Sequence, residues 1–327
     1  MTCGTRKSFF LCLPSFVLTS PSIPIRFSFM NSKVTSIFAT AGLIVTALIW
    51  GFSFVIVKDS LDYIGAMYMV AYRYTIASVI MALIFIKKWR LFNRDYLVNG
   101  ALTGAFLFIA YATQTIGCNY TSAGKNAFLT TIYVILIPFI TWILSKKRPS
   151  LFVFIAALMS ITGIGLLALG SEDTTGVNKG DLLTLICGIF FALHIVFTER
   201  FNHKGGDPLF LTLLQFVFVA VFGWIFAPFF DGNFPFSTAF SSRVILSMLY
   251  LGVFSTMVGF SLQNLGLKYV QSSIASLILS FESVFGMLFS ALLMHEQLTA
   301  RMLCGCALIF AAVVLSETTK SISIKNE

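Results

Sequence analysis

The segment IFATAGLIVTALIWGFSFVIV, residues 37–57, contains no charged residue. A helix of about 20 mostly apolar residues crosses the hydrocarbon core of a bilayer, so this segment has the length and composition of one membrane span. The rest of the chain is similar in kind, because 57% of its 327 residues are hydrophobic and only 11% are charged. A soluble globular protein has about twice that charged fraction. We therefore predict an all-α integral membrane protein.

Ten segments of the chain fit this description, and the joins between them carry proline, glycine and charge. No join is long enough to hold a folded soluble domain. The predicted transmembrane helices cover residues 37–57, 65–86, 97–117, 126–144, 151–169, 181–198, 208–229, 244–267, 273–294 and 301–316.

Residues 1–29 are expected to lie outside this helical fold. Arg6 and Lys7 precede an apolar run that Pro14 interrupts, a pattern that loosely resembles a signal peptide. Met30, however, is followed by Asn-Ser-Lys and then by an apolar helix, which has the form of a natural start. We expect the first 29 residues to be a disordered leader or the product of an upstream start codon.

Lysine and arginine are distributed unequally between alternate joins. One side receives the clusters at residues 87–94 and 146–148 together with Lys33, Arg200, Lys204, Lys268, Lys320 and Lys325. The opposite side receives Lys58, Lys125, Lys179, Arg243 and Arg301. Because basic residues accumulate in cytoplasmic joins, we predict a multi-pass cell-membrane protein with both termini in the cytoplasm. The net charge of +9 is spread over these joins, which argues against a nucleic-acid partner.

The two halves of the chain resemble each other. A shift of 149 positions places FSLQNLGLKY (residues 260–269) over YATQTIGCNY (residues 111–120), so that Gln114 meets Gln263. The same shift places the fourth predicted helix over the ninth and the fifth over the tenth. A slightly different shift places Trp50 and Lys58 over Phe191 and Glu199.

Each half contains five predicted helices, an odd number, so the second half must enter the membrane from the opposite side. This predicts two inverted five-helix repeats, residues 30–172 and 173–327, an architecture that many secondary transporters use for alternating access.

Several short motifs follow one another in a specific order, and together they resemble the drug/metabolite transporter superfamily, in particular its EamA-type members with ten helices. The motifs are LIWGFSF (residues 48–54), AYRY (71–74), TSAGKNAF (121–128), Pro138, FESVF (281–285) and HEQLT (295–299). The resemblance covers residues 35–316. Two positions depart from the family pattern: Ser283, where the family often has proline, and KKRP (146–149) in place of a Glu-Arg-Pro-like ending. The resemblance implies an exporter of a small metabolite, an amino-acid-like solute or a drug.

Three ionisable residues, Arg73, Glu282 and His194, lie inside predicted helices, where charge is costly and often functional. Arg73 could bind an anionic group, or it could reach the interface as a structural residue. Glu282 could carry a proton or pair with a cationic solute, or it could hold helices together through a hydrogen bond. A contact between Arg73 and Glu282 would be compatible with both roles. His194 lies among apolar neighbours and is more simply explained as a packing residue.

Polar side chains recur at helical spacing in three other predicted helices. They could line a cavity and bind a solute, or they could join helices by hydrogen bonds. The repeat-related pair Gln114 and Gln263 favours the cavity. These candidates are Tyr111 and Gln114; Asn126, Thr130 and Tyr133; and Gln263 and Asn264.

No GxxxxGK[ST], GxSxG or HExxH motif occurs in the sequence, and no CxxC pair accompanies a histidine. We therefore predict no catalytic residue, no metal, no cofactor and no ATP-driven step. The expected partners are a small solute, the bilayer and a proton or other ion that drives transport; monomer and homodimer both stay open. The alternatives are a lipid scramblase or non-transporting chaperone subunit, and a membrane-embedded enzyme, although an enzyme would need a cluster of catalytic groups.

Overall fold

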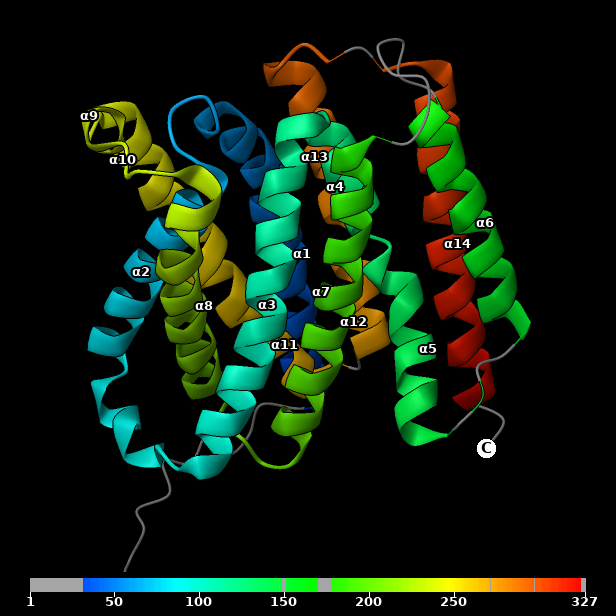
Figure 1. The fold of residues 1–327 in the computed structure, drawn as a ribbon. Helices are drawn as coiled ribbons and strands as arrows, with labels where there is room; N and C mark the ends of the chain where they lie inside the picture. The colour runs from blue at the N-terminus through cyan, green and yellow to red at the C-terminus, as the bar shows by residue number, and fades with distance from the viewer. Residues whose placement is uncertain are drawn as a thin grey trace, which may run out of the picture.

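A computed structural model describes residues 32–146, 148, 151–169, 178–270, 272–296 and 298–324, and within these ranges it is helical without a strand (Figure 1). The predicted leader, residues 1–29, lies outside the described residues. The helices of the first half are α1 (Ser32–Ser60), α2 (Ala66–Ile84), η1 (Ile86–Leu91), α3 (Arg94–Tyr120), α4 (Ala123–Thr130), α5 (Tyr133–Ser145) and α6 (Leu151–Leu169). Those of the second half are α7 (Lys179–His203), α8 (Pro208–Asp231), α9 (Phe236–Ala239), α10 (Ser242–Leu249), η2 (Tyr250–Val258), α11 (Gly259–Tyr269), α12 (Ser272–Leu279), α13 (Phe281–Leu293) and α14 (Ala300–Ile324).

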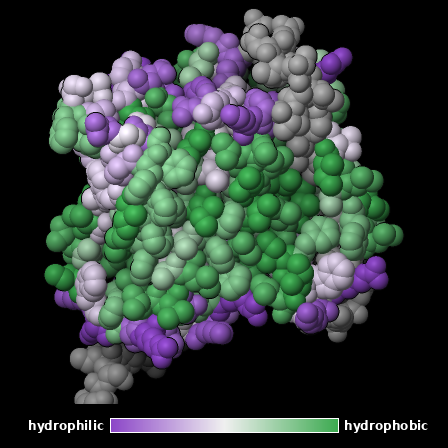
Figure 2. Space-filling model, in the orientation of Figure 1, coloured by the Kyte–Doolittle hydropathy of each residue, from purple (hydrophilic) through white to green (hydrophobic). Residues whose placement is uncertain are grey.

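Eight helical segments of the described chain are long and apolar enough to cross a membrane. Figure 2 shows the result on the surface, where a broad hydrophobic belt lies between two hydrophilic rims. The prediction of an all-α, multi-pass membrane protein is therefore confirmed. Two further apolar stretches, Phe154–Gly163 in α6 and Ala300–Ala312 in α14, are shorter, so the count of ten spans stays a prediction.

Helices from the two halves of the chain pack against one another throughout the bundle. The most extensive contacts join α3 with α7, α2 with α8, α1 with α13, and α6 with α14. In Figure 1, α6 and α14 stand together at one edge, while α1, α3, α7 and α11 lie near the centre. The beginning of α1 and the end of α14 lie at the same end of the bundle.

Two of the predicted helices are divided in the structure. The segment predicted at 126–144 consists of α4 and α5, which meet at Thr131 and Ile132. The segment predicted at 273–294 consists of α12 and α13, which meet at Ser280. Both divisions lie in the middle of an apolar segment, and the sequence analysis did not anticipate them.

Each division has a local cause. In the first half, the carbonyl of Phe128 accepts the backbone N–H of Thr131 at 3.1 Å and the hydroxyl of Thr131 at 2.7 Å. In the second half, the carbonyl of Ser280 accepts both the backbone N–H of Ser283, at 3.0 Å, and its hydroxyl, at 2.7 Å. Such side-chain bonds compete with the regular helical pattern.

The span from Ser242 to Tyr269, which includes the eighth predicted helix at 244–267, contains nine residues of π-helix at its centre. This element, η2, lies between α10 and α11 and packs against α1 and α2. π-helical turns inside α-helices are rare and are frequent at functional sites, because they displace side chains from their α-helical positions.

Candidate functional site

A cavity lies at the centre of the bundle, between helices from both halves of the chain. The empty space between its lining atoms is about 510 Å³. The centre of a water molecule can occupy only about 30 Å³ of the cavity, so the cavity is narrow in this conformation. The lining residues are Trp50, Ser53, Phe54, Val57, Arg73, Tyr111, Gln114, Asn126, Tyr133, Phe191, Ile195, Ser255, Gln263 and Glu282. Seven of the ten residues predicted from the sequence are among them.

Arg73 is the buried cation of this cavity, with 2% of its surface exposed. Its Nε donates to the hydroxyl of Thr256 at 2.9 Å, and its Nη2 donates to the hydroxyl of Ser255 at 2.8 Å. Among the described residues, no carboxylate forms an ion pair with the guanidinium. Arg73 is therefore held by neutral acceptors, and its charge is available to an anionic group in the cavity.

The π-helix η2 provides both of these acceptors. Ser255 and Thr256 are consecutive residues of η2, and both are buried. The carbonyl of Ser255 also accepts the indole N–H of Trp50 at 2.8 Å. The π-helix thus ties α1 and α2 to the second half of the chain at the point where Arg73 enters the cavity.

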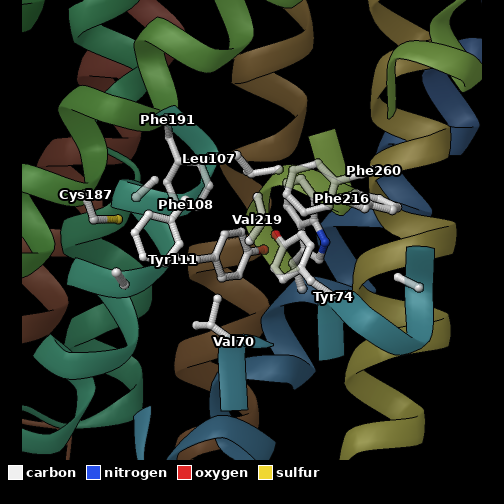
Figure 3. Packing of buried hydrophobic residues seen from close by; sticks show 14 of the residues in the cluster. Val70, Tyr74, Leu107, Phe108, Tyr111, Cys187, Phe191, Phe216, Val219 and Phe260 are labelled. Atoms are coloured by element: carbon white, nitrogen blue, oxygen red, sulfur yellow. The ribbon is translucent and has the colours of Figure 1, made fainter. Parts of the chain in front are cut away.

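Aromatic side chains surround the guanidinium. The ring of Tyr111 lies 4.8 Å from the Cζ of Arg73, and the ring of Tyr74 lies 5.7 Å from it. Figure 3 shows Tyr74 and Tyr111 pointing toward one another, with Phe216 and Phe260 beside them. Aromatic faces attract a cation, so these rings contribute to holding a charge that has no acidic partner.

Glu282 is the buried carboxyl group of the cavity, with 4% of its surface exposed. It lies in the first turn of α13, directly after the division at Ser280. The hydroxyl of Tyr133 donates to its Oε1 at 3.0 Å. Tyr133 is itself the first residue of α5, directly after the other division. Glu282 and Arg73 do not form an ion pair with each other, although both line the cavity.

Three amide side chains complete the polar lining. Gln114 donates from Nε2 to the hydroxyl of Thr130 at 3.1 Å. Asn126 donates from Nδ2 to the hydroxyl of Thr184 at 2.9 Å, while its buried Oδ1 has no hydrogen-bond partner in the described part of the chain. Gln263 lies on the opposite half of the chain and donates to Oδ1 of Asn264 at 3.2 Å. The repeat-related residues Gln114 and Gln263 therefore both reach the same cavity.

Three of the predicted site residues lie outside the cavity lining. Thr130 supports Gln114 through the hydrogen bond described above. Asn264 donates from Nδ2 to Thr212 at 2.7 Å and to Gln215 at 3.2 Å, and so joins α11 to α8. His194 is fully buried and meets the ring of Phe260 edge-on, with 5.8 Å between the ring centroids. Asn264 and His194 thus occupy packed positions between helices.

Other lining residues were absent from the sequence-based candidates. Trp50 is one large apolar residue among many in its segment, and Ser53 and Ser255 carry no signal that separates them from other small polar residues in a helix. A clue exists for Ser255, because it is followed by Thr256 in an otherwise apolar segment. The π-helix that aims both hydroxyls at Arg73 is not apparent from the sequence.

Comparisons with known proteins agree with this architecture. The model of the EamA-like transporter family matches the chain twice, at residues 37–169 and 178–318. An uncharacterized transporter of Archaeoglobus fulgidus is 33% identical over 282 residues, which cover 86% of each chain. The uncharacterized transporter YoaV of Bacillus subtilis is 24% identical over 288 residues, covering 86% of this chain and 97% of YoaV. A crystal structure with 16% identity has a TM-score of 0.66 and covers 86% of this chain and 96% of its own, which shows a shared fold.

Proposed function

The chain belongs to the EamA-like transporter family, and from this premise we propose that it is a secondary transporter that moves a small organic solute across a cell membrane by alternating access. The solute would be a metabolite, an amino-acid-like molecule or a drug, and the direction would be outward. Both proposals follow the family resemblance, and the polar and charged side chains that line the central cavity support a polar solute.

We propose that ten helices form two inverted repeats, residues 30–172 and 173–327. Two observations support this. The family model matches the chain twice, once in each of these regions. In addition, the divisions of the two broken helices correspond, because Thr131 and Ser280 stand 149 positions apart, the shift that aligns the halves. Inverted repeats with broken helices beside a central site are typical of transporters that work by alternating access.

In this proposal Arg73 and Glu282 bind the solute. Arg73 would bind a carboxylate or another anionic group, since it has spare N–H donors and no acidic partner among the described residues. Glu282 would pair with a cationic group or carry the coupling proton. A solute with both charges would bridge the two residues, which accords with an amino-acid-like molecule.

The orientation follows from the basic residues. The end of the bundle that carries Lys87, Lys88, Arg90 and Arg94 would face the cytoplasm, together with both termini. The opposite end, where α4 begins, would then face outward.

The observation that carries the proposal is that Arg73 and the carboxyl group of Glu282 line one buried cavity between the two halves, and neither forms an ion pair among the described residues. The test is flux of radiolabelled amino acids and small carboxylates in proteoliposomes containing the purified protein, with and without a pH gradient. We expect transport of at least one solute, and we expect Arg73→Ala to abolish it while Thr113→Val, whose hydroxyl bonds within α3, leaves it intact. If lipid scrambling appeared without solute flux, a scramblase would replace this proposal.

A further inference from the structure

The first turn of α4 is held by two acidic side chains from the second half of the chain. The Nζ of Lys125 lies 2.8 Å from Oδ2 of Asp181, and the two side chains are 4% and 1% exposed. Glu296 accepts the backbone N–H of Ala123 at 2.9 Å and that of Gly124 at 3.3 Å. Both acidic residues therefore join α4 to the second half.

Both carboxylate oxygens of Asp181 accept hydrogen bonds in this arrangement. Its Oδ1 accepts the hydroxyl of Thr121 at 3.1 Å, and its Oδ2 accepts the N–H of Asn178 at 3.1 Å as well as Lys125. Removing two charges from water is costly, and a buried ion pair often adds little to stability compared with apolar residues of the same size. In the proposed transport cycle the two halves must separate. A buried ion pair between them is therefore better explained as a contact that forms in one conformation and is exposed to water in the other.

The contact is connected to the central cavity by a short helix. The eight residues of α4 are about 12 Å long at the α-helical rise. Asn126 lines the cavity from α4, and after the division that follows α4 the hydroxyl of Tyr133 donates to Glu282. A movement of the first turn of α4 would therefore displace Asn126 and change the shape of the cavity.

The positions that correspond to Lys125 and Asp181 in the other half carry no charge. With the shift of 149 positions, Ile274 is the counterpart of Lys125. With the shift of 141 positions, which aligns Lys58 with Glu199, Thr40 is the counterpart of Asp181. The first turn of α12 is capped instead by Glu199 of its own half, which accepts the N–H of Ser272 at 2.9 Å. At that end the halves are joined by Lys88 and Asp207, whose side chains are 27% and 29% exposed, and exposed pairs contribute little.

We propose that Lys125, Asp181 and Glu296 form a charge latch, which closes the cavity at the end where α4 begins and must break each time that end opens. Among the described residues, the opposite end has no buried ion pair at the positions equivalent to Lys125 and Asp181, and in this proposal it opens without such a barrier. The inference rests on the proposed alternation between two conformations. Its test measures conformation and not flux, so a failure of the latch and a failure of solute transport are distinguished.

The test compares two cysteine reporters in purified protein in lipid nanodiscs, in a background whose six native cysteines are replaced by alanine. Val57→Cys reports on the latched end of the cavity, because Val57 lies near the end of α1, where Lys58 donates to the carbonyl of Thr121 in the turn between α3 and α4. Leu211→Cys reports on the opposite end, because Leu211 is buried in the first turn of α8, where its N–H bonds to the carbonyl of Asp207. Each is labelled with a hydrophilic maleimide, and the labelling rate is measured.

We expect Lys125→Met to raise the labelling rate at position 57 by about tenfold or more, because breaking a buried pair removes a large part of the closing free energy. The rate at position 211 should change less than about twofold, because Leu211 lies at the end that the latch does not close and distant substitutions usually have small effects. Lys125→Arg keeps the cation and should label as the parent does. Ile274→Met, the matched change at the opposite end, should alter neither reporter.

Equal labelling of position 57 in the parent and in Lys125→Met would overturn the latch, and so would a parallel rise at both reporters, which would indicate general loosening. Should Lys125→Met fail to fold, Thr121→Val removes one cross-half donor to Asp181 and should raise labelling at position 57 alone, by a smaller factor. Misfolding of both variants would show that the pair is purely structural and would also reject the proposal.

Discussion

Tyr133 and Glu282 are 149 residues apart, the separation of equivalent positions in the two halves, and they are joined by a hydrogen bond of 3.0 Å. Each residue stands in the first turn of a helix that begins at a division in the middle of the membrane. Two repeats related by a twofold axis bring equivalent residues together only on that axis. In the proposed inverted repeats the contact would therefore lie where the two halves exchange roles, and it links a hydroxyl group on one half to a carboxyl group on the other.

The first prediction concerns the carboxyl group of that contact. Glu282→Gln keeps the size of the side chain and can still accept from Tyr133, but it cannot release or bind a proton. If Glu282 carries the coupling proton, flux driven by a pH gradient should fall by at least about tenfold, while exchange of solute without a gradient persists. The measurement is solute flux in proteoliposomes between pH 5 and 9. A wild-type rate and pH profile in this variant would remove Glu282 from the coupling step.

The hydroxyl of Thr256 is the subject of the second prediction. Thr256→Val preserves the shape of the side chain but removes the acceptor for Nε of Arg73. A hydrogen bond to a charged group contributes about 1.5–3 kcal/mol, so the KM for an anionic solute should rise by about tenfold or more. The maximal rate should change much less if Thr256 only positions the guanidinium.

The matched control for this variant is Thr113→Val. The hydroxyl of Thr113 bonds to the carbonyl of Ile109 in its own helix at 2.8 Å, away from Arg73. A similar rise in KM for both variants would mean that the effect comes from loss of a hydroxyl in the membrane and not from the position of Arg73.

Part of this site could be predicted from the sequence, because the bilayer makes ionisable and amide side chains conspicuous. Arg73, Glu282, Gln114 and Gln263 stand out in apolar segments, and all four reach the cavity. However, the face of a helix on which a residue lies does not reveal which other helix packs against that residue. Asn264 satisfies the same pattern as Gln263, but α8 lies against it and provides Thr212 and Gln215 as partners.

The divisions of the broken helices and the π-helix η2 were beyond sequence reasoning for a different reason. Hydropathy identifies a span from its total apolar length, and the spans that contain α4 with α5, or α10 with η2 and α11, retain that length. What changes is the hydrogen-bond register of a few residues, which depends on packing against helices far away in the sequence. Thr131 gave only a weak local signal for the first division, as Ser280 and Ser283 did for the second.

A third prediction tests the contact between α2 and α8. A Cβ at Gly223 would lie 2.9 Å from the Cα of Ala71, a backbone atom that cannot move without the helix. Gly223→Ala should therefore lower the free energy of unfolding by roughly 1–3 kcal/mol, as overpacking does elsewhere, despite the better helix propensity of alanine. Thermal unfolding of the purified protein measures the effect.

Val221→Ala on the same helix provides the comparison, because Val221 is 47% exposed and its side chain is shortened without a new contact. Its midpoint should remain within a few degrees of the parent, as is usual for exposed substitutions. A midpoint for Gly223→Ala equal to that of Val221→Ala would show that α2 and α8 can separate at little cost.

The last prediction concerns Pro138, which lies inside α5. Pro138→Ala supplies the missing N–H, which can then bond to the carbonyl of Val134, and it removes a ring that distorts a helix. Proline inside a helix costs about 3 kcal/mol relative to alanine, so the variant should unfold at a higher temperature. A straighter α5 would also turn Tyr133, its first residue, away from Glu282 and weaken their hydrogen bond. We therefore expect flux to fall as stability rises, measured on the same preparation by proteoliposome transport and thermal unfolding. Higher stability with undiminished flux would show that the transport cycle does not need a proline in α5.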